Sequence, residues 1–168
     1  MRESSSRTMR WVKWLYGQAK SGRFLTEVLR SARVPSRVAN EELLARYCDL
    51  KAIRSKIKPK IFYSSSLTPP LELSVDRVLY CDPRERCKRE TESMGKARGF
   101  VTLTAGDVRK IERTTVVSDK PPPEHAAIVL GLSERPVPTL AAIKAEADLF
   151  AQFDRVCVDL AKMAKLPP

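Results

Sequence analysis

The order of apolar and polar residues predicts helices in the first part of the chain. Over residues 9–33, apolar residues recur mostly at helical steps with cations between them. This pattern predicts a basic amphipathic helix, either continuous or broken near Gly17 and Gly22. A further helix is predicted from Asn40, a good N-cap, to the residues before Pro59, because apolar side chains follow at steps of three and four.

The next part of the chain has the pattern of strands. A strand is expected at 71–80, because apolar and polar residues alternate over 71–76 as in a strand with one face in water. A short strand is expected at 61–63. Charges of both signs alternate over residues 81–90, which indicates a solvated loop or a short helix.

Two more strands are expected at residues 100–104 and 108–117. The step at 104–107 has the composition of a turn, so the two strands are expected to form a hairpin. Helix is the alternative for residues 109–113.

The last part of the chain predicts a linker and a long helix. Three prolines at 121–123 form a stiff spacer, and the apolar run 126–132 is either a buried strand or a short helix. Residues 138–165 contain no helix breaker. Five apolar residues in this helix have the alternating four- and three-residue spacing of a seam: Leu149, Phe153, Val156, Leu160 and Met163.

That seam has two interpretations. A second row of apolar residues beside the seam widens the apolar face of the helix. A wide apolar face favours packing into the protein's own core. A helix so near the end of a chain is also suited to docking on another subunit, so the five seam residues are candidate protein-interface residues.

These elements predict an α+β fold with basic N-terminal helices, a small and mostly antiparallel sheet in the middle, and a long C-terminal amphipathic helix. The predicted segments are a basic N-terminal segment at 1–37, a basic helix with a mixed β region at 38–120, and a proline-rich linker with the interaction helix at 121–168. With 168 residues the chain has the size of one domain.

Charge changes this picture because it is concentrated at one end. The net charge is +11, and residues 1–63 alone hold 15 Lys and Arg against 5 Asp and Glu, a net +10. Because the chain is 43% hydrophobic, it has enough apolar residues for a core, which excludes a wholly disordered basic tail. The basic end is therefore the part expected to contact a polyanion.

One interpretation of the basic end is phosphate binding. Over residues 51–60, cations alternate with isoleucines, so the apolar side chains can anchor the segment while the cations face a nucleic-acid backbone. Flexible lysines suit nonspecific phosphate contact better than base readout. The candidate nucleic-acid-binding residues of this run are Lys51, Arg54, Lys56, Lys58 and Lys60.

Two other interpretations concern the first 37 residues. Aromatic residues beside cations have the composition of a helix that lies in an anionic membrane interface. The candidate membrane residues are Trp11, Trp14, Lys13, Lys20 and Arg23. The same segment holds nine basic and two acidic residues with many serines, a composition similar to that of an organellar transit peptide. This composition favours a mitochondrial location. The alternative locations are cytoplasmic or membrane-peripheral.

The stretch 95–103 adds two candidate residues. It is similar to the first ribonucleoprotein motif of RNA recognition domains, in which a basic residue and a glycine precede aromatic strand positions. It lacks the second aromatic position of that motif, and no partner strand lies upstream, so it does not place the chain in that family. Its cations, Lys96 and Arg98, join the candidate nucleic-acid-binding residues.

No motif indicates a metal, a cofactor or an enzyme. The four cysteines are scattered without zinc-ligand spacing, and the single His125 has no nucleophile near it in the sequence. Acidic residues alternate with cations, as in solvated charge pairs. We therefore expect no catalytic residues, no metal and no cofactor, with a nuclease of dispersed acidic residues as a minor alternative.

The sequence thus predicts a non-enzymatic, basic RNA-binding accessory subunit of a ribonucleoprotein particle, with an organellar ribosome as one example. Its expected partners are RNA or another polyanion and the protein subunits of a larger assembly. The alternative from a different class is a peripheral membrane or matrix-like protein that binds anionic lipid through the Trp-bearing N-terminal helix.

Overall fold

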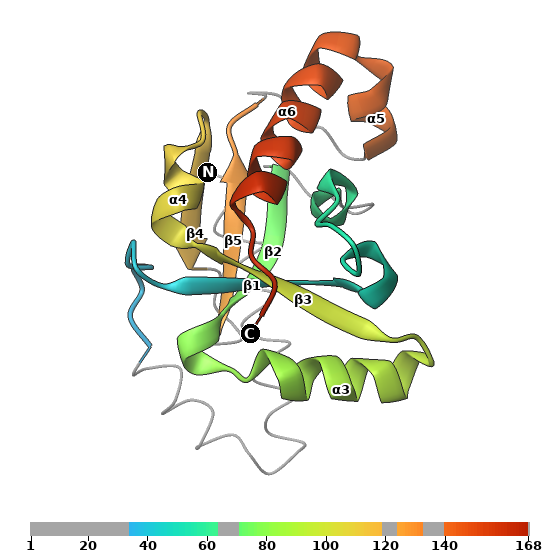
Figure 1. Cartoon of the computed structure of the whole chain (residues 1–168). Coiled ribbons are helices and arrows are strands. Elements are labelled where there is room, and N and C mark those ends of the chain that lie inside the picture. The colour runs from blue at the N-terminus through green and yellow to red at the C-terminus, as the bar shows by residue number, and fades with distance from the viewer. Residues whose placement is uncertain (1–33, 64–70, 119–123, 133–139, 168) are drawn as a thin grey trace, which may run out of the picture.

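A computed structural model describes residues 34–63, 71–118, 124–132 and 140–167 (Figure 1). The predicted basic helix at 9–33 and the proline linker at 121–123 lie outside the described residues, and so do all five candidate membrane residues. No helix among the described residues is long and apolar enough to cross a membrane.

The described residues confirm the predicted α+β class, because helices pack on an antiparallel five-stranded sheet (Figure 1). The order of strands across the sheet is β3-β1-β2-β5-β4. Their bounds are β1 (Leu43–Asp49), β2 (Leu71–Arg77), β3 (Arg98–Thr104), β4 (Thr114–Ser118) and β5 (His125–Leu130). The sheet thus extends past the middle of the chain into the segment that follows the proline linker.

Helices complete the architecture. The α-helices are α3 (Pro83–Met94), α4 (Ala105–Lys110), α5 (Leu140–Ala145) and α6 (Ala147–Met163), and the short 3₁₀ turns are η1 (Leu50–Ala52), η2 (Pro59–Phe62) and η3 (Val78–Tyr80). In the view of Figure 1, α3 runs below the sheet and α6 above it.

The two faces of the sheet carry cores of different size. Successive residues of a strand point to opposite faces, so Leu44 and Ala45 of β1 are both fully buried but in different clusters. Ala45 joins Cys87 and Phe100 in a small cluster beside α3. The main cluster includes Leu44, Leu73, Leu103, Ile128, Ile143, Phe153 and Leu160.

The helix predicted from Asn40 to Pro59 is wrong, because residues 43–49 form strand β1. All seven residues of β1 pair with β3, from Leu43 opposite Thr104 to Asp49 opposite Arg98. An amphipathic helix buries one stripe, whereas this segment is buried on both faces, and long-range pairing overrides the local helical pattern. The strand predicted at 61–63 is also wrong, because Ile61 and Phe62 belong to η2.

The predicted hairpin at 100–117 is wrong as well. Thr104 caps helix α4, where its side chain accepts from the backbone N–H of Asp107 at 3.1 Å, and strand β4 begins only at Thr114. Strands β3 and β4 lie at opposite edges of the sheet. The helical alternative for residues 109–113 is right only for its first two residues, since α4 ends at Lys110.

The mixed-charge segment after β2 is a well-capped helix, longer than the short helix that the sequence offered as an alternative. The Asp82 carboxylate accepts from the Arg84 N–H at 2.9 Å, Pro83 occupies the first turn, and Gly95 ends the helix with a φ of +64°. The left-handed conformation explains why glycine stands at this position. These capping residues were the sequence signal for α3.

The C-terminal predictions are largely confirmed. The strand alternative for 126–132 is right, because β5 pairs with both β2 and β4. The long helix exists but is interrupted at Glu146, whose backbone is extended, so that it forms α5 and α6. Since β5 and α6 share the sheet and the main core with earlier elements, the predicted segments 38–120 and 121–168 are not structurally separate.

Candidate nucleic-acid interface

The predicted basic run lies in the connection from β1 to η2, and we call residues 51–60 the basic loop. Its isoleucines point inward, as the alternation predicted: Ile53 is buried, Ile57 packs against the main core, and Ile61 just beyond the loop is also buried. Backbone hydrogen bonds between residues close in sequence fold the loop into turns. In one of them the Ile53 N–H donates to the Leu50 carbonyl at 3.2 Å. The loop is therefore anchored to the core by its apolar residues.

The cations of the basic loop point away from that anchor. Lys51, Arg54, Lys56 and Lys60 are exposed, and Lys58 is half-buried. Residues 51–60 contain no acidic residue, and none of the ion pairs within the described residues involves these five cations. Five uncompensated positive charges on one anchored loop can hold the phosphates of a polyanion.

The tertiary structure brings Lys96 to the same end of the sheet. The Leu50 N–H at the start of η1 donates to the Ala97 carbonyl at 3.0 Å, so the turn from α3 into β3 lies beside the basic loop. Gly99 makes room for this approach, because a Cβ there would lie 2.9 Å from Ile53 Cδ1 and 3.0 Å from Leu50 Cδ1, and both side chains would have to shift. The two basic segments that the sequence proposed separately thus form one surface.

Arg98 does not belong to that surface. Its Nη1 donates to Asp49 Oδ1 at 2.8 Å and its Nε donates to Glu90 Oε2 at 3.1 Å. Partial burial lowers the pKa of the Arg98 guanidinium, but the hydrogen bonds to these two carboxylates outweigh it and leave the pKa above its ordinary value. Both carboxylates already compensate the charge of Arg98, so we leave it out of the candidate phosphate-binding surface.

The aromatic position of the ribonucleoprotein-like stretch is also turned inward. Phe100 is buried in the small cluster beside α3, and its ring centroid lies 6.3 Å from that of Tyr47. RNA recognition domains stack bases on exposed aromatic rings of a sheet. Phe100 offers no such platform, so on this strand the structure does not provide the stacking position of that motif.

A second group of cations is fully compensated by acidic residues. We call Arg77, Arg86 and Arg98 the paired arginines. Arg86 donates through Nη1 to the buried carboxylate of Asp76 and through Nε to Glu90 Oε1 at 3.1 Å. With Arg98, this gives a chain of alternating charge along one side of α3, and its carboxylates are Asp76, Glu90 and Asp49.

Tyr47 completes this chain from strand β1. Its hydroxyl donates to Asp76 Oδ2 at 3.2 Å, and the Arg86 guanidinium lies 4.6 Å from the centre of its ring. Burial and the nearby charge of Asp76 raise the pKa of the Tyr47 hydroxyl well above its ordinary value. Tyr47 is therefore a neutral hydrogen-bond donor that holds the Asp76 carboxylate.

The third paired arginine, Arg77, is completely buried. Its guanidinium donates to both carboxylate oxygens of Glu42, at 2.7 and 2.8 Å, and to the backbone carbonyls of Pro35 and Arg37 at 2.7 and 3.3 Å. The Tyr80 ring lies 4.6 Å from it. Arg77 therefore ties the segment before β1 to strand β2.

Burial disfavours the thiolate form of the cysteines. All four are free, and burial raises the pKa of Cys81 and Cys87 to about 11 and that of Cys157 to about 12. Burial also raises the pKa of Cys48. Within the described ranges, no three His, Cys, Asp or Glu side chains converge as they would around a metal ion.

Sequence reasoning missed one polar contact. Ser74 Oγ on β2 lies 2.5 Å from His125 Nε2 on β5, so His125 does have a hydroxyl beside it. Because Asp76 stands opposite His125 and Ser74 opposite Ala127, the pair is a diagonal cross-strand contact. Asp76 Oδ2, which could orient the imidazole of a catalytic triad, is held instead by Arg86 and Tyr47.

The candidate protein-interface residues lie mainly inside the chain's own core. Leu149, Phe153, Val156 and Leu160 are buried against the sheet and η2, and Met163 is half-buried. The core-packing interpretation of the seam therefore describes these residues, and they do not present a free docking surface.

No protein family, characterised protein or solved structure is detectably similar to this chain.

Proposed function

We propose that this protein binds RNA, or a polyanion of the same kind, through the basic loop and Lys96. The observation that carries the proposal is the arrangement of the loop, in which isoleucines are buried while five cations without a carboxylate partner among the described residues point outward. The contacts are to phosphates and are insensitive to base sequence, because the loop offers mainly lysine heads.

The role that suits such a surface is a non-enzymatic accessory subunit of a ribonucleoprotein particle. One end of the sheet carries the cations, while the acidic residues beside α3 are neutralised by arginines. A mitochondrial ribosome is the assembly that the basic, serine-rich N-terminal segment favours.

The experiment compares three proteins by fluorescence anisotropy with a labelled RNA duplex over a range of salt concentrations. They are the parent, the loop variant Lys56→Gln/Lys58→Gln/Lys60→Gln, and a control, Lys88→Gln/Arg89→Gln/Lys162→Gln, which removes three cations elsewhere. Each phosphate contact contributes about 0.7 to 0.9 to the slope of log K against log salt. The loop variant is expected to lose about 2 to 3 of that slope and about a hundredfold in affinity at 0.1 M salt.

The control decides between a local surface and overall charge. It has the same net charge as the loop variant, so a polyanion attracted only by the total charge would bind both equally weakly. We expect the control to stay within about threefold of the parent, since its cations lie outside the surface. Equal losses in both variants, or no loss in the loop variant, would contradict the proposal.

Repeating the titration with anionic vesicles addresses the membrane alternative. If Trp11→Ser/Trp14→Ser abolishes vesicle binding and the loop variant binds RNA as well as the parent does, the membrane function replaces the RNA function. If the parent prefers RNA and the Trp variant binds RNA normally, the RNA function stands.

A further inference from the structure

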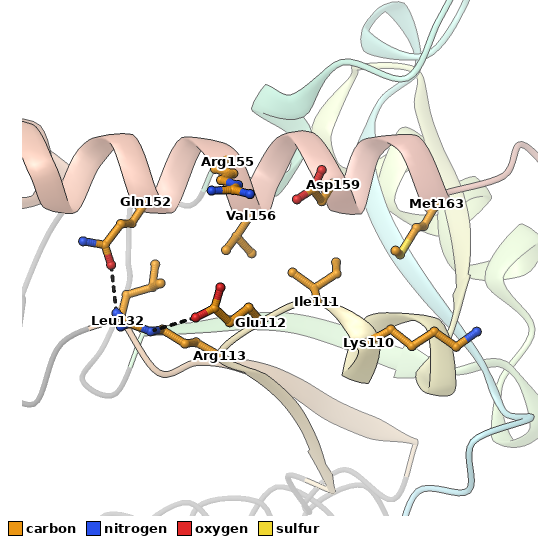
Figure 2. A pocket seen from close by; sticks show the side chains of 10 residues that line it. All are labelled: Lys110, Ile111, Glu112, Arg113, Leu132, Gln152, Arg155, Val156, Asp159 and Met163. Carbon is orange, nitrogen blue, oxygen red and sulfur yellow. Dashed lines mark hydrogen bonds and ion pairs between the residues drawn. The ribbon is translucent and has the colours of Figure 1, made fainter.

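A pocket of about 390 Å³ lies between helix α6 and the segment that joins α4 to β4 (Figure 2). Figure 2 shows Val156 of α6 and Ile111 pointing toward each other across it, with the Gln152–Arg113 contact at one end and Met163 and Lys110 at the other. Leu132 completes the apolar part of the lining. At about 30 Å³ for each water-sized group, the pocket has room for about a dozen non-hydrogen atoms.

The rim of the pocket carries more positive than negative charge. Lys110, Arg113 and Arg155 are the cations, and Glu112 and Asp159 are the acids. Lys110 is compensated by Asp107, a residue outside the lining, at 2.8 Å. Asp159 is compensated by Lys162 at 2.9 Å, a residue outside the lining, and Glu112 lies 3.8 Å from Arg113. Arg155 makes no ion pair with any described carboxylate. An oxyanion at the rim would therefore meet a guanidinium that is not yet engaged.

The backbone at the rim is held in an unfavourable conformation. Arg113 has a φ of +61°, the only non-glycine residue with positive φ among those described. A close turn holds it there: its carbonyl accepts from the Gly131 N–H at 2.7 Å, and its Nη1 donates to Gln152 Oε1 at 2.9 Å. An arginine at such a position costs about 1 kcal/mol relative to glycine. Glycine would relieve this strain but would remove the guanidinium from the rim.

We propose that this pocket binds a small organic oxyanion, a carboxylate or phosphate monoester with an apolar body of about a dozen non-hydrogen atoms. The apolar body lies against Ile111, Leu132 and Val156, and the oxyanion is bound at the rim by Arg155 and Arg113. Planar guanidinium groups bind carboxylate and phosphate oxygens in pairs, which explains arginine on both sides of the opening. This ligand site does not include the basic loop. The loop lies in the connection from β1 to η2, whereas the pocket lies between α6 and the segment from α4 to β4.

The test follows the backbone amide signals of the ¹⁵N-labelled full chain in NMR titrations with three matched compounds. They are 3-phenylpropionate, 3-phenylpropanol and 3-phenylpropylamine, which share an apolar body and differ in charge. The anion is expected to shift signals of residues 111–113 and 152–163 in a saturable way, with a Kd on the order of 1 mM. The alcohol should bind at least about tenfold more weakly and the amine should not saturate.

3-Phenylpropyl phosphate, which keeps the phenylalkyl body, separates the two sources of the oxyanion in a parallel titration. Tighter binding than that of 3-phenylpropionate assigns the site to phosphate esters, and weaker binding assigns it to carboxylates. Equal binding of the anion, alcohol and amine, or shifts that map elsewhere, would overturn the proposal.

Two substitutions then test the arginines. Arg155→Gln should weaken binding of the anion about tenfold and leave that of the alcohol unchanged, while Arg89→Gln on α3 serves as the control and should leave both unchanged. Arg113→Gly should weaken anion binding and at the same time raise the melting temperature, because glycine tolerates the positive φ. A residue with only a structural role would change the stability alone. Unchanged anion binding in both variants would refute the assignment.

Discussion

Two regions of this molecule use positive charge in opposite ways. In the basic loop, four lysines and one arginine form no ion pair with any described carboxylate, and all but Lys58 are exposed. The paired arginines, Arg77, Arg86 and Arg98, instead each bind carboxylates through directed hydrogen bonds, and Arg77 is fully buried. Arginine suits enclosed pairs because its planar group donates in several fixed directions, whereas lysine suits contact with a solvated polyanion.

The difference teaches which charges support the fold and which are available for a partner. Removing one member of an enclosed pair leaves the other buried without a partner, which costs much more than removing an exposed charge. The charge of the basic loop is therefore free for binding, whereas that of the paired arginines is already used inside the protein. The following substitutions test this contrast, from the largest expected effect to the smallest.

Replacing Arg77 should have the largest effect on stability. Arg77→Met leaves the Glu42 carboxylate and the carbonyls of Pro35 and Arg37 without their donor, and we expect a loss of about 3 to 5 kcal/mol in the free energy of unfolding. Urea denaturation followed by circular dichroism measures it. The same substitution in the basic loop, Arg54→Met, should change the free energy by less than about 0.5 kcal/mol. Similar losses in both variants would erase the contrast.

Removing the carboxylate of Asp76 should have an intermediate effect. Asp76→Ala deprives Arg86 and Tyr47 of their acceptor, but the side chain of Arg86 is 36% exposed and can turn to water. We expect a loss of about 2 kcal/mol in the same urea experiment. Asp159→Ala is the control, because its partner Lys162 is 71% exposed and such pairs contribute less than about 1 kcal/mol. A control loss as large as that of Asp76→Ala would contradict this ranking.

The Glu42–Arg77 pair should also make stability depend on pH. Burial raises the pKa of Glu42, but the hydrogen bonds from Arg77 and from the Ala39 N–H, with the charges of Arg77 and Arg109, hold it below its ordinary value of 4.5. A lowered folded-state pKa stabilises the protein above about pH 4.5, and this stabilisation disappears as the pH falls through the folded-state value. The difference in unfolding free energy between the parent and Glu42→Gln should therefore be constant from pH 7 to 5 and shrink below about 4.5. A difference that stays constant down to pH 3 would mean that the pair does not depress this pKa.

The smallest effect on stability is expected in the basic loop. Lys56→Gln/Lys58→Gln/Lys60→Gln removes exposed like charges that repel one another, so the free energy of unfolding should stay within about 0.5 kcal/mol of the parent or rise slightly. A loss above about 1 kcal/mol would show that these lysines have partners in the fold. Together with the loss of RNA affinity proposed above, an unchanged stability would separate binding from folding.

Local patterns in the sequence predicted some parts of this structure well. The strand expected at 71–80 is β2, although β2 ends at Arg77 and residues 78–80 form η3. The apolar run at 126–132 allowed strand β5, and the long unbroken segment predicted the helical end. In the basic run, the alternation of isoleucines and cations correctly predicted an anchored side and an open side. Such features depend on residues that are close in sequence, so periodicity reveals them.

Other parts were decided by contacts between distant residues. Residues 43–49 have the spacing of an amphipathic helix, yet pairing with β3 and burial from both faces make them a strand. Arg98 looked like a free cation beside Lys96 until Asp49, 49 residues earlier, proved to be its partner. The contact between Ser74 and His125 likewise depends on the register of two strands.

By itself, the sequence determined where the positive charge lies along the chain and which residues between the cations of the basic loop are apolar. Only the tertiary structure decided which of those charges are compensated, because ion pairs such as Arg77–Glu42 and Arg98–Asp49 form between segments that the sheet brings together. It also decided that Lys96 joins the basic loop, through the bond from Leu50 to Ala97. The net charge follows from composition, whereas the charge available to a partner depends on which side chains face one another in the folded protein.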